Sequence, residues 1–189
     1  MIKAIIFDCF GVLTTEAWLP FKAKYFGHDP ELMDEVDDIS MQANMGLISR
    51  EEAMQGTSKL AGLTPAEAFK AIDRNVPNEE LFDYIRELKA DYKLGILSNI
   101  SDNRLHQIFD ADQLALFDTI ILSFKEGFIK PQPEAFKAAA EQLGISIREC
   151  VLIDDQERNI SGAKSTGMEA ILYKDVEQLK RELGPLLKS

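Results

Sequence analysis

Five short runs of apolar residues recur along the chain, and each is bounded by polar residues or glycine. They cover residues 3–8, 93–98, 119–123, 150–154 and 170–173. Runs of this length without regular polar alternation are typical of strands buried on both faces of a parallel sheet. Because helical patterns separate the later runs, the chain predicts an α/β fold in which helices cover a parallel sheet.

Three of the intervening helices can be located from the sequence. Residues 79–92 carry apolar side chains at helical spacing after Asn78, a suitable N-cap residue. Residues 133–143 repeat that spacing and stop at Gly144, a residue common at helix C-terminal ends. Residues 175–183 form the last predicted helix.

The segment 15–77 differs from the rest because it contains no convincing strand. Capping-box patterns at residues 49–52 and 64–67 predict two helix starts within it. We interpret residues 1–14 and 78–189 as a Rossmann-like core domain, and residues 15–77 as a helical cap inserted after the first strand. A cap in this position would exclude water and select substrate. Alternatively, these are extra helices that merely decorate the sheet.

Composition and charge exclude several classes of function. The chain is 46% hydrophobic and 28% charged, as in ordinary globular proteins. A net charge of −11 without a basic run argues against nucleic-acid binding. No apolar stretch approaches the roughly 18 residues of a membrane helix. The sequence starts directly in a strand pattern, without a signal-peptide pattern, so we expect a cytoplasmic protein. The sequence leaves the oligomeric state open between monomer and homodimer.

Cysteine chemistry is not indicated. Cys9 and Cys150 both adjoin apolar runs, which is typical of small buried residues in a reducing compartment. A catalytic Cys9 would need a histidine nearby, but His28 and His106 lie in polar segments. The chain also has no metal-finger spacing.

Polar residues follow the apolar runs at the points where strands of a parallel sheet end. Asp8 ends the first run, and the pairs Ser98-Asn99 and Asp154-Asp155 end two later ones. Open α/β sheets bind ligands at the carboxyl ends of their strands. Asp8 is therefore a candidate nucleophile. Gly11 permits an unusual backbone conformation after Asp8, which would bring the backbone near Phe10 close to a metal or phosphate.

Asp154 and Asp155 predict a metal site. Two adjacent acids at the end of a buried strand are costly without compensation, and Mg²⁺ prefers oxygen ligands. Asn159 follows one helical turn after Asp155 and could orient a ligand or water. The simpler alternative is that Asp154 caps the following helix while Asp155 faces solvent.

Lys130 and the pair Ser98-Asn99 complete the candidate site. A lysine among several carboxylates would screen their repulsion and bind an anionic substrate. The hydroxyl and amide of Ser98 and Asn99 could bind phosphate oxygens, although such a pair also forms ordinary loops.

With all these pieces in order, the chain resembles the haloacid dehalogenase superfamily of hydrolases over essentially its whole length. Residues 5–13 (IIFDCFGVL), 97–99 (LSN), 130–131 (KP) and 151–155 (VLIDD) are similar to its four motifs. The fourth is followed by Asn159 and the pair Gly162-Ala163. The inserted helices are similar to the cap of the subclass that holds many small phosphatases and the dehalogenases.

This resemblance implies a sheet order of 5-4-1-2-3 and a mechanism. Asp8 would attack phosphorus to form an aspartyl-phosphate, which water then hydrolyses. Mg²⁺ would be held by Asp8, the main-chain oxygen of Phe10 and Asp155, with Asp154 at or near the metal. Catalytic and substrate-binding roles fall on four further side chains: Ser98, Asn99, Lys130 and Asn159.

One position departs from the phosphatase pattern. Phe10 stands where related phosphatases usually carry an aspartate that protonates the leaving group and then activates water. Such acid–base help is typically worth about 10²–10⁴-fold in rate. Therefore either the substrates have good leaving groups, or another residue or water substitutes, or turnover is slow.

Three functions follow from these observations. The first is an Mg²⁺-dependent phosphatase acting on a small phosphorylated metabolite. The second is a dehalogenase-like hydrolase, since dehalogenases also have an aromatic residue at the position of Phe10, although their fourth motif lacks the acidic pair. The third is a catalytically degenerate protein that binds a phosphorylated ligand or a partner without turnover. The acidic pair Asp154-Asp155 favours the phosphatase.

Overall fold

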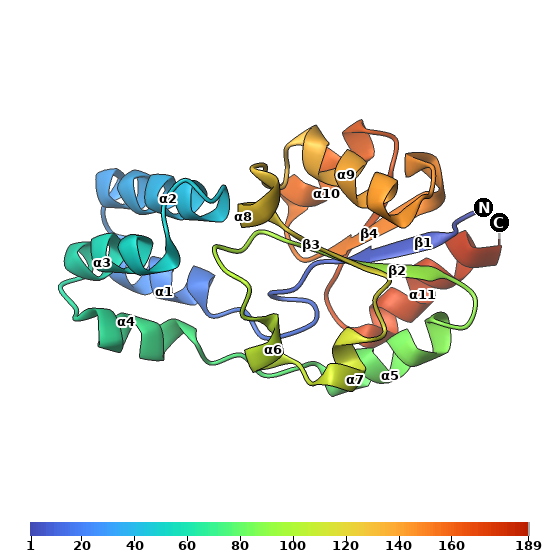
Figure 1. The fold of residues 1–189 in the computed structure, drawn as a ribbon, viewed down its shortest axis with the longest axis horizontal. Helices are drawn as coiled ribbons and strands as arrows, with labels where there is room; N and C mark the ends of the chain where they lie inside the picture. Colours follow the sequence, from blue (N-terminus) through green and yellow to red (C-terminus); the bar gives the residue numbers. More distant parts are fainter. Residues whose placement is uncertain (189) are drawn as a thin grey trace.

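The computed structural model describes residues 1–188, and its centre is a five-stranded parallel sheet (Figure 1). The order β3-β2-β1-β4-β5 is the predicted order. The strands are β1 (Ala4–Phe7), β2 (Lys93–Ser98), β3 (Thr119–Leu122), β4 (Cys150–Asp154) and β5 (Glu169–Leu172). They match the five apolar runs to within one residue at most ends, so the runs were correctly interpreted as buried parallel strands.

Helices cover both faces of the sheet because alternate side chains of β1 point in opposite directions. Ile5 and Phe7 pack with α5 (Glu79–Leu88) and α11 (Val176–Lys188). Ala4 and Ile6 pack with α9 (Pro133–Leu143) and α10 (Glu157–Ser165) on the other face. All four β1 residues are fully buried. These two apolar layers fix β1, and with it Asp8, at the centre of the sheet.

Two helix ends differ from the predicted ones. Helix α5 stops at Leu88 instead of residue 92, because the amides of Asp91 and Tyr92 both donate to the Leu88 carbonyl and close a turn. Helix α11 continues past Leu183 through Pro185 to Lys188. Apolar residues of that last turn pack against the core, which outweighs the poor helix propensity of proline.

Short helices between the strands were not predicted. They are α6 (Leu105–Ile108), α7 (Ala111–Leu114), α8 (Ser123–Glu126) and the 3-10 turn η1 (Ile147–Glu149). Each has only three or four residues, too few for a periodic apolar pattern.

The segment 15–77 folds into four helices: α1 (Trp18–Phe26), α2 (Pro30–Asn44), α3 (Arg50–Leu60) and α4 (Pro65–Ile72). The capping boxes at Ser49 and Thr64 are both formed, as predicted. Apolar residues of all four helices form a separate small core. Figure 1 shows these helices as a distinct group beside the carboxyl-terminal edge of the sheet.

Two neighbouring segments connect this group to the sheet. The Thr15 amide donates to the Val76 carbonyl at 3.1 Å, and the Val76 amide donates to Thr15 Oγ1 at 3.0 Å. Next along, the Asn78 amide donates to the Leu13 carbonyl at 2.9 Å. The chain therefore leaves and re-enters the sheet region through two hydrogen-bonded connecting segments, which hold the helices over the end of β1.

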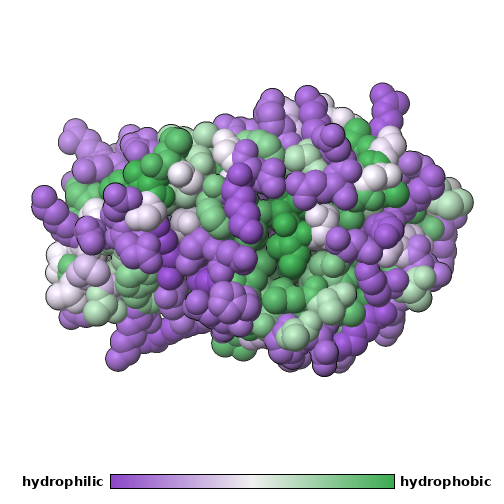
Figure 2. Space-filling view, in the orientation of Figure 1, coloured by the Kyte–Doolittle hydropathy of each residue, from purple (hydrophilic) through white to green (hydrophobic). Residues whose placement is uncertain are grey.

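The face of the molecule seen in Figure 2 is mainly polar. Figure 2 shows hydrophilic side chains over most of the visible face, with an apolar strip near its middle, where the edge strand β3 lies in Figure 1. Within residues 1–188, no helix combines the length and the apolar character needed to cross a membrane.

Candidate active site

The predicted site residues meet at the carboxyl-terminal edge of the sheet. Asp8 follows β1 directly, Ser98 ends β2 and Asp154 ends β4. Since β1 pairs with both β2 and β4, Asp8 lies between the other two, as predicted. Lys130 reaches this edge from the loop that precedes α9.

Lys130 bridges two of the carboxylates. Its Nζ lies 2.7 Å from Asp8 Oδ1 and 2.7 Å from Asp154 Oδ2. All three side chains are almost completely buried. Burial alone would lower the pKa of Lys130, but the carboxylates of Asp154 and Asp8 outweigh it and raise that pKa above its ordinary value. Lys130 is therefore a fixed positive charge beside the candidate nucleophile.

Asp154 is fully engaged by hydrogen bonds. Asn159 Nδ2 donates to Asp154 Oδ1 at 2.9 Å and to Oδ2 at 3.1 Å, and the Gln156 amide donates to Oδ1 at 2.9 Å. Together with Lys130, these donors satisfy both oxygens of the carboxylate. Asp154 thus positions Lys130 and Asn159. The N-cap of α10 is Gln156, without a side-chain cap bond, so Asp154 is not the helix cap of the simpler alternative.

Asp155 has the opposite character. Its Oδ1 is buried, and no hydrogen-bond partner for it lies among residues 1–188. Burial and the neighbouring charges of Asp154 and Glu16 raise the pKa of Asp155 to about 6. Gly11 makes the close approach of Asp155 possible, because a Cβ built at Gly11 would lie 2.2 Å from Asp155 Oδ2. Gly11 also has a φ of +88°, the unusual conformation that the sequence predicted.

The three carboxylates form a group that fits a divalent cation. Oxygen atoms of Asp8, Asp154 and Asp155 all lie within 4.8 Å of one another. Three carboxylates and the one ammonium group of Lys130 leave a formal charge of −2, and burial with incomplete compensation raises the pKa of Asp8 well above its ordinary value. The orphaned Asp155 oxygen and the excess negative charge both suit a hard cation with oxygen ligands. Phe10 lies in the same turn, and its main-chain oxygen stays a predicted ligand.

The Ser98 hydroxyl and the Asn99 amide differ in their hydrogen bonding. Ser98 Oγ is buried without a partner in the described chain. Asn99 instead holds the Lys130 backbone: its Nδ2 donates to the Lys130 carbonyl at 2.9 Å, and the Lys130 amide donates to its Oδ1 at 2.8 Å. Like Asn159, Asn99 therefore positions other groups of the site. The predicted contacts of both asparagines with substrate stay predictions.

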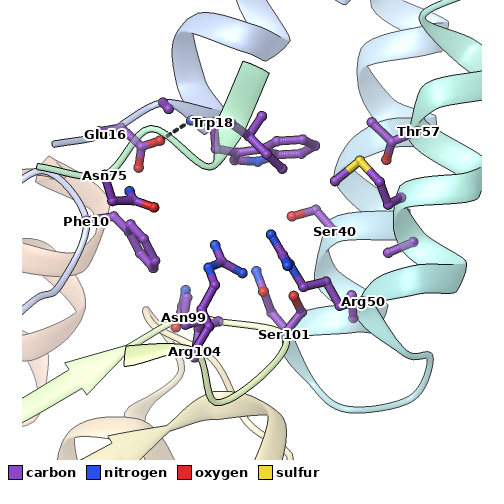
Figure 3. A pocket seen from close by; sticks show the side chains of 17 residues that line it. Phe10, Glu16, Trp18, Ser40, Arg50, Thr57, Asn75, Asn99, Ser101 and Arg104 are labelled. Atoms are coloured by element: carbon purple, nitrogen blue, oxygen red, sulfur yellow. Dashed lines mark hydrogen bonds between the residues drawn. The ribbon is translucent and has the colours of Figure 1, made fainter. Parts of the chain in front are cut away.

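Two adjoining cavities open above Asp8. One, of about 440 Å³, is lined by Asp8, Lys130, Asn159 and residues of α1 and α2. The other, of about 130 Å³, lies between the loop after β2 and helices α1 to α3 (Figure 3). Phe10 and Asn99 line both cavities. The inserted helices thus form one wall of the space around the candidate nucleophile.

Three charged residues of the smaller cavity were not predicted: Glu16, Arg50 and Arg104. Burial raises the pKa of Glu16, and its Oε1 accepts hydrogen bonds from the Trp18 and Leu19 amides at the start of α1. Each of the three comes from a different part of the fold. Only tertiary structure brings them together, and no sequence motif marks them.

The aromatic residues of α1 have two different environments. Trp18 lines both cavities. Phe21 and Phe26 are buried in the core of the inserted helices, and Tyr25 packs against that core.

The cysteines are inert, as expected. Cys9 and Cys150 are free and buried. Burial, together with the charge of Asp8, raises the pKa of Cys9 far above its ordinary value, and burial raises that of Cys150 to about 11. His28 and His106 are exposed, so neither activates Cys9.

Comparison with known proteins decides the family. Residues 2–167 match the sequence profile of haloacid dehalogenase-like hydrolases. The chain belongs to this family. It is 27% identical to the (S)-2-haloacid dehalogenase of Xanthobacter autotrophicus, over 97% of this chain and 80% of that protein. It is 31% identical to the beta-phosphoglucomutase of Bacillus subtilis (strain 168), over 90% of this chain and 82% of that protein.

A solved structure supports the metal assignment for this haloacid dehalogenase-like hydrolase. The family enzyme BT-2542 of Bacteroides thetaiotaomicron, in complex with magnesium and inorganic phosphate, superimposes with a TM-score of 0.72. The two proteins are 26% identical, and the match covers 95% of this chain and 99% of that one. The predicted cofactor, Mg²⁺, is thus the metal of that relative, and it fits the carboxylates of Asp8, Asp154 and Asp155.

Proposed function

We propose that this hydrolase is an Mg²⁺-dependent phosphatase that acts on a small phosphorylated molecule through an aspartyl-phosphate on Asp8. The observation that carries the proposal is the pairing of a buried Asp8–Lys130 contact of 2.7 Å with the orphaned carboxylate oxygen of Asp155. The Asp8–Lys130 contact supplies a nucleophile beside a fixed positive charge. The Asp155 oxygen supplies a ligand for a cation. The magnesium and phosphate complex of the related structure agrees with both.

The mechanism follows from the positions of these side chains. An oxygen of Asp8 attacks phosphorus, and the bond from phosphorus to the leaving oxygen breaks. Water then attacks the phosphorus of the aspartyl-phosphate, which restores the Asp8 carboxylate and releases inorganic phosphate. Lys130 lies beside Asp8, where charge develops on the phosphoryl oxygens, and the buried, unpaired Ser98 hydroxyl would donate to those oxygens.

Mg²⁺ would be held by Asp8, Asp155 and the main-chain oxygen of Phe10, and it supplies positive charge that offsets repulsion between Asp8 and the phosphate. Asp154 contributes by fixing Lys130 and Asn159.

The inserted helices act as the cap in this proposal. They carry the walls of both cavities that face away from the sheet. Water exclusion by such a wall strengthens the electrostatic interactions around Asp8 and limits competing hydrolysis.

Phe10 restricts the class of substrate. Its side chain lines both cavities but has no proton to give or take. Substrates whose leaving groups need no protonation, such as acyl or activated aryl phosphates, are therefore turned over fastest.

A dehalogenase-like activity is the second candidate. It is favoured by the aromatic side chain of Phe10 and by the likeness to the Xanthobacter dehalogenase. The dehalogenase-like reaction differs from the phosphatase reaction because displacement at carbon needs no Mg²⁺. It therefore gives no role to the unpaired carboxylate oxygen of Asp155. Metal-independent halide release from a 2-haloacid is its specific mark.

The deciding experiment measures phosphate release from an aryl phosphate and an acyl phosphate, with Mg²⁺ or with a chelator. We expect Mg²⁺-dependent release that is lost in Asp8→Asn and retained in Asp83→Asn, an exposed aspartate on α5 that serves as the matched control. Release that persists in Asp8→Asn contradicts the nucleophile. No release from the wild type, followed by halide release without metal, would favour the dehalogenase. Phosphate trapped on Asp8 without turnover would favour a binding protein.

A further inference from the structure

The smaller cavity carries two arginines that the phosphatase mechanism does not use. Arg50 enters from the start of α3, and Arg104 enters from the loop after β2. Figure 3 shows both guanidinium groups directed into the cavity. Each side chain is only 13% exposed. Two arginines from separate parts of the fold are thus held largely away from water at one place.

Each arginine is paired with an aspartate, but one guanidinium donor is left unused. Arg104 Nη1 lies 2.9 Å from Asp102 Oδ1, and Arg50 Nη1 lies 3.7 Å from the other oxygen of the same carboxylate. Arg50 also pairs with Asp73. Asp102 and Asp73 are about one third exposed and do not line the cavity. Arg104 Nε is buried without a partner in residues 1–188, so a donor remains unused.

The remaining walls suit the organic part of a small ligand. The Arg104 guanidinium lies 5.4 Å from the centre of the Phe10 ring, which keeps the ring and the charge together. The lining contains both apolar side chains, such as Trp18 and Met54, and residues with hydroxyl or amide groups, such as Ser40, Thr57 and Asn75. The lining itself carries two arginines and one acid, Glu16, and the two aspartates that pair with the arginines, Asp73 and Asp102, lie outside it.

The cavity adjoins the space above Asp8. Phe10 and Asn99 belong to both linings, so one molecule could place a phosphate at Asp8 and extend past Phe10. We infer that the Arg50–Arg104 cavity binds a second anionic group of the substrate, a carboxylate or a second phosphate. This inference rests on the proposed phosphatase function. The guanidinium fork matches both groups through paired N–H donors.

Binding of synthetic probes to the Mg²⁺-loaded full chain tests the inference. Calorimetry gives the Kd of ω-carboxyalkyl phosphates with two to five carbons, of alkyl phosphates of equal length, and of the corresponding alkanediol bisphosphates. We expect the best carboxylated or bisphosphorylated probe to bind on the order of ten- to hundredfold more tightly than its alkyl counterpart. Comparison of the two anionic series identifies which group the site prefers.

Arginine variants locate the effect. In Arg104→Gln and Arg50→Gln, the ratio of Kd values between alkyl and anionic probes should fall toward one. Arg86→Gln, an exposed arginine on α5, should leave that ratio unchanged. Arg104→Lys keeps the charge but loses the fork, so it should give an intermediate ratio. This variant decides the matter if Arg104→Gln unfolds.

Asp102→Asn separates binding from a purely structural role. If the arginines only tie the inserted helices to the sheet through Asp102, this change should lower the Kd ratio as much as the arginine changes do. If they bind substrate, removal of the competing carboxylate should keep or raise the ratio.

Failure of this inference is distinguishable from failure of the phosphatase. A Kd ratio near one at every chain length, or a ratio unchanged in both arginine variants, overturns the second anion site even if phosphate release is observed. An arginine-dependent ratio without phosphate release sustains the site and overturns the proposed turnover. If neither an arginine-dependent Kd ratio nor phosphate release is observed, the second anion site and the proposed phosphatase are both overturned.

Discussion

Lys130 Nζ lies 2.7 Å from Asp8 Oδ1, and both side chains are almost completely buried. The same nitrogen is equally close to Asp154. A single buried ammonium group thus compensates two carboxylates that the sheet brings together. The function of Asp8 and the stability of this end of the sheet consequently depend on the same contact.

Replacement of Lys130 by methionine should both inactivate and destabilise the protein. Methionine keeps most of the volume but leaves two buried carboxylates without their cation, and breaking a buried pair typically costs about 3–5 kcal/mol. Chemical denaturation should show a free energy of unfolding lower by about that amount at pH 7. Phosphate release should be lost.

The double variant Lys130→Met with Asp154→Asn provides the control. Removal of one of the two stranded carboxylates should recover part of the lost free energy of unfolding without recovering activity. If Lys130→Met and the wild type have the same midpoint denaturant concentration, the buried contacts of Lys130 do not stabilise the fold.

Asp155 should make the metal-free protein sensitive to pH. Its pKa is raised to about 6 in the folded state, from an ordinary value of 3.8. A raised acid pKa means that stability is present at low pH and is lost as pH rises through about 6. Because Asp155 is partly exposed to solvent, this rise of its pKa should cost the folded protein only about 1–2 kcal/mol above pH 6.

Asp155→Asn isolates this effect. With chelator present, the free energy of unfolding of the variant at pH 8 should exceed that of the wild type by about 1–2 kcal/mol. This difference should shrink toward pH 4.5. With Mg²⁺ the order should reverse, because only the wild type gains stability from bound metal. Thermal unfolding of both proteins at pH 4.5 and pH 8, with Mg²⁺ and with chelator, measures these differences in stability. A variant that gains as much from Mg²⁺ as the wild type contradicts the ligand role of Asp155.

Much of the sheet and of the site could be predicted from the sequence because their determinants are local. Buried parallel strands require unbroken apolar runs, and all five runs became strands. Asp8 and Asp154 each end such a run, so the sheet itself sets their positions. The order of the strands came from the resemblance to a known family, since the runs alone do not specify which strands pair.

The remaining features depend on tertiary contacts. Arg50 and Arg104 are ordinary polar residues in their own segments, and only docking of α3 beside the loop after β2 brings them into one cavity. The amides of Asn99 and Asn159 bind Lys130 and Asp154, partners that the sequence did not indicate, and their predicted contacts with substrate stay predictions. Residue type and spacing indicate that a side chain reaches a site, whereas its partners there are set by three-dimensional packing.

Gly11 should tolerate no side chain. Its φ is +88°, and an added Cβ would lie 2.2 Å from Asp155 Oδ2. Gly11→Ala should therefore lower the free energy of unfolding by about 1–3 kcal/mol and weaken Mg²⁺ binding, because Asp155 has to move. Calorimetric titration with Mg²⁺ measures the second effect. Gly144→Ala is the matched control, since Gly144 also has a positive φ, of 68°, but meets nothing within 4 Å. Equal Mg²⁺ affinity in the two variants would contradict the contact.

Phe10→Asp tests whether the missing acid limits turnover. The aspartate would lie two residues after Asp8, on a backbone that already faces both cavities. If proton transfer to the leaving group is the limiting step, kcat/KM on an alkyl phosphate should rise about 10²-fold, with a smaller change on an aryl phosphate. Phe10→Asn removes the same ring and its contact with Arg104 but cannot transfer a proton. An equal gain in both variants would mean that the ring obstructs substrate, whereas a gain confined to aspartate means that the site lacks only its acid. No gain in either would place the limiting step elsewhere and favour substrates whose leaving groups depart unprotonated.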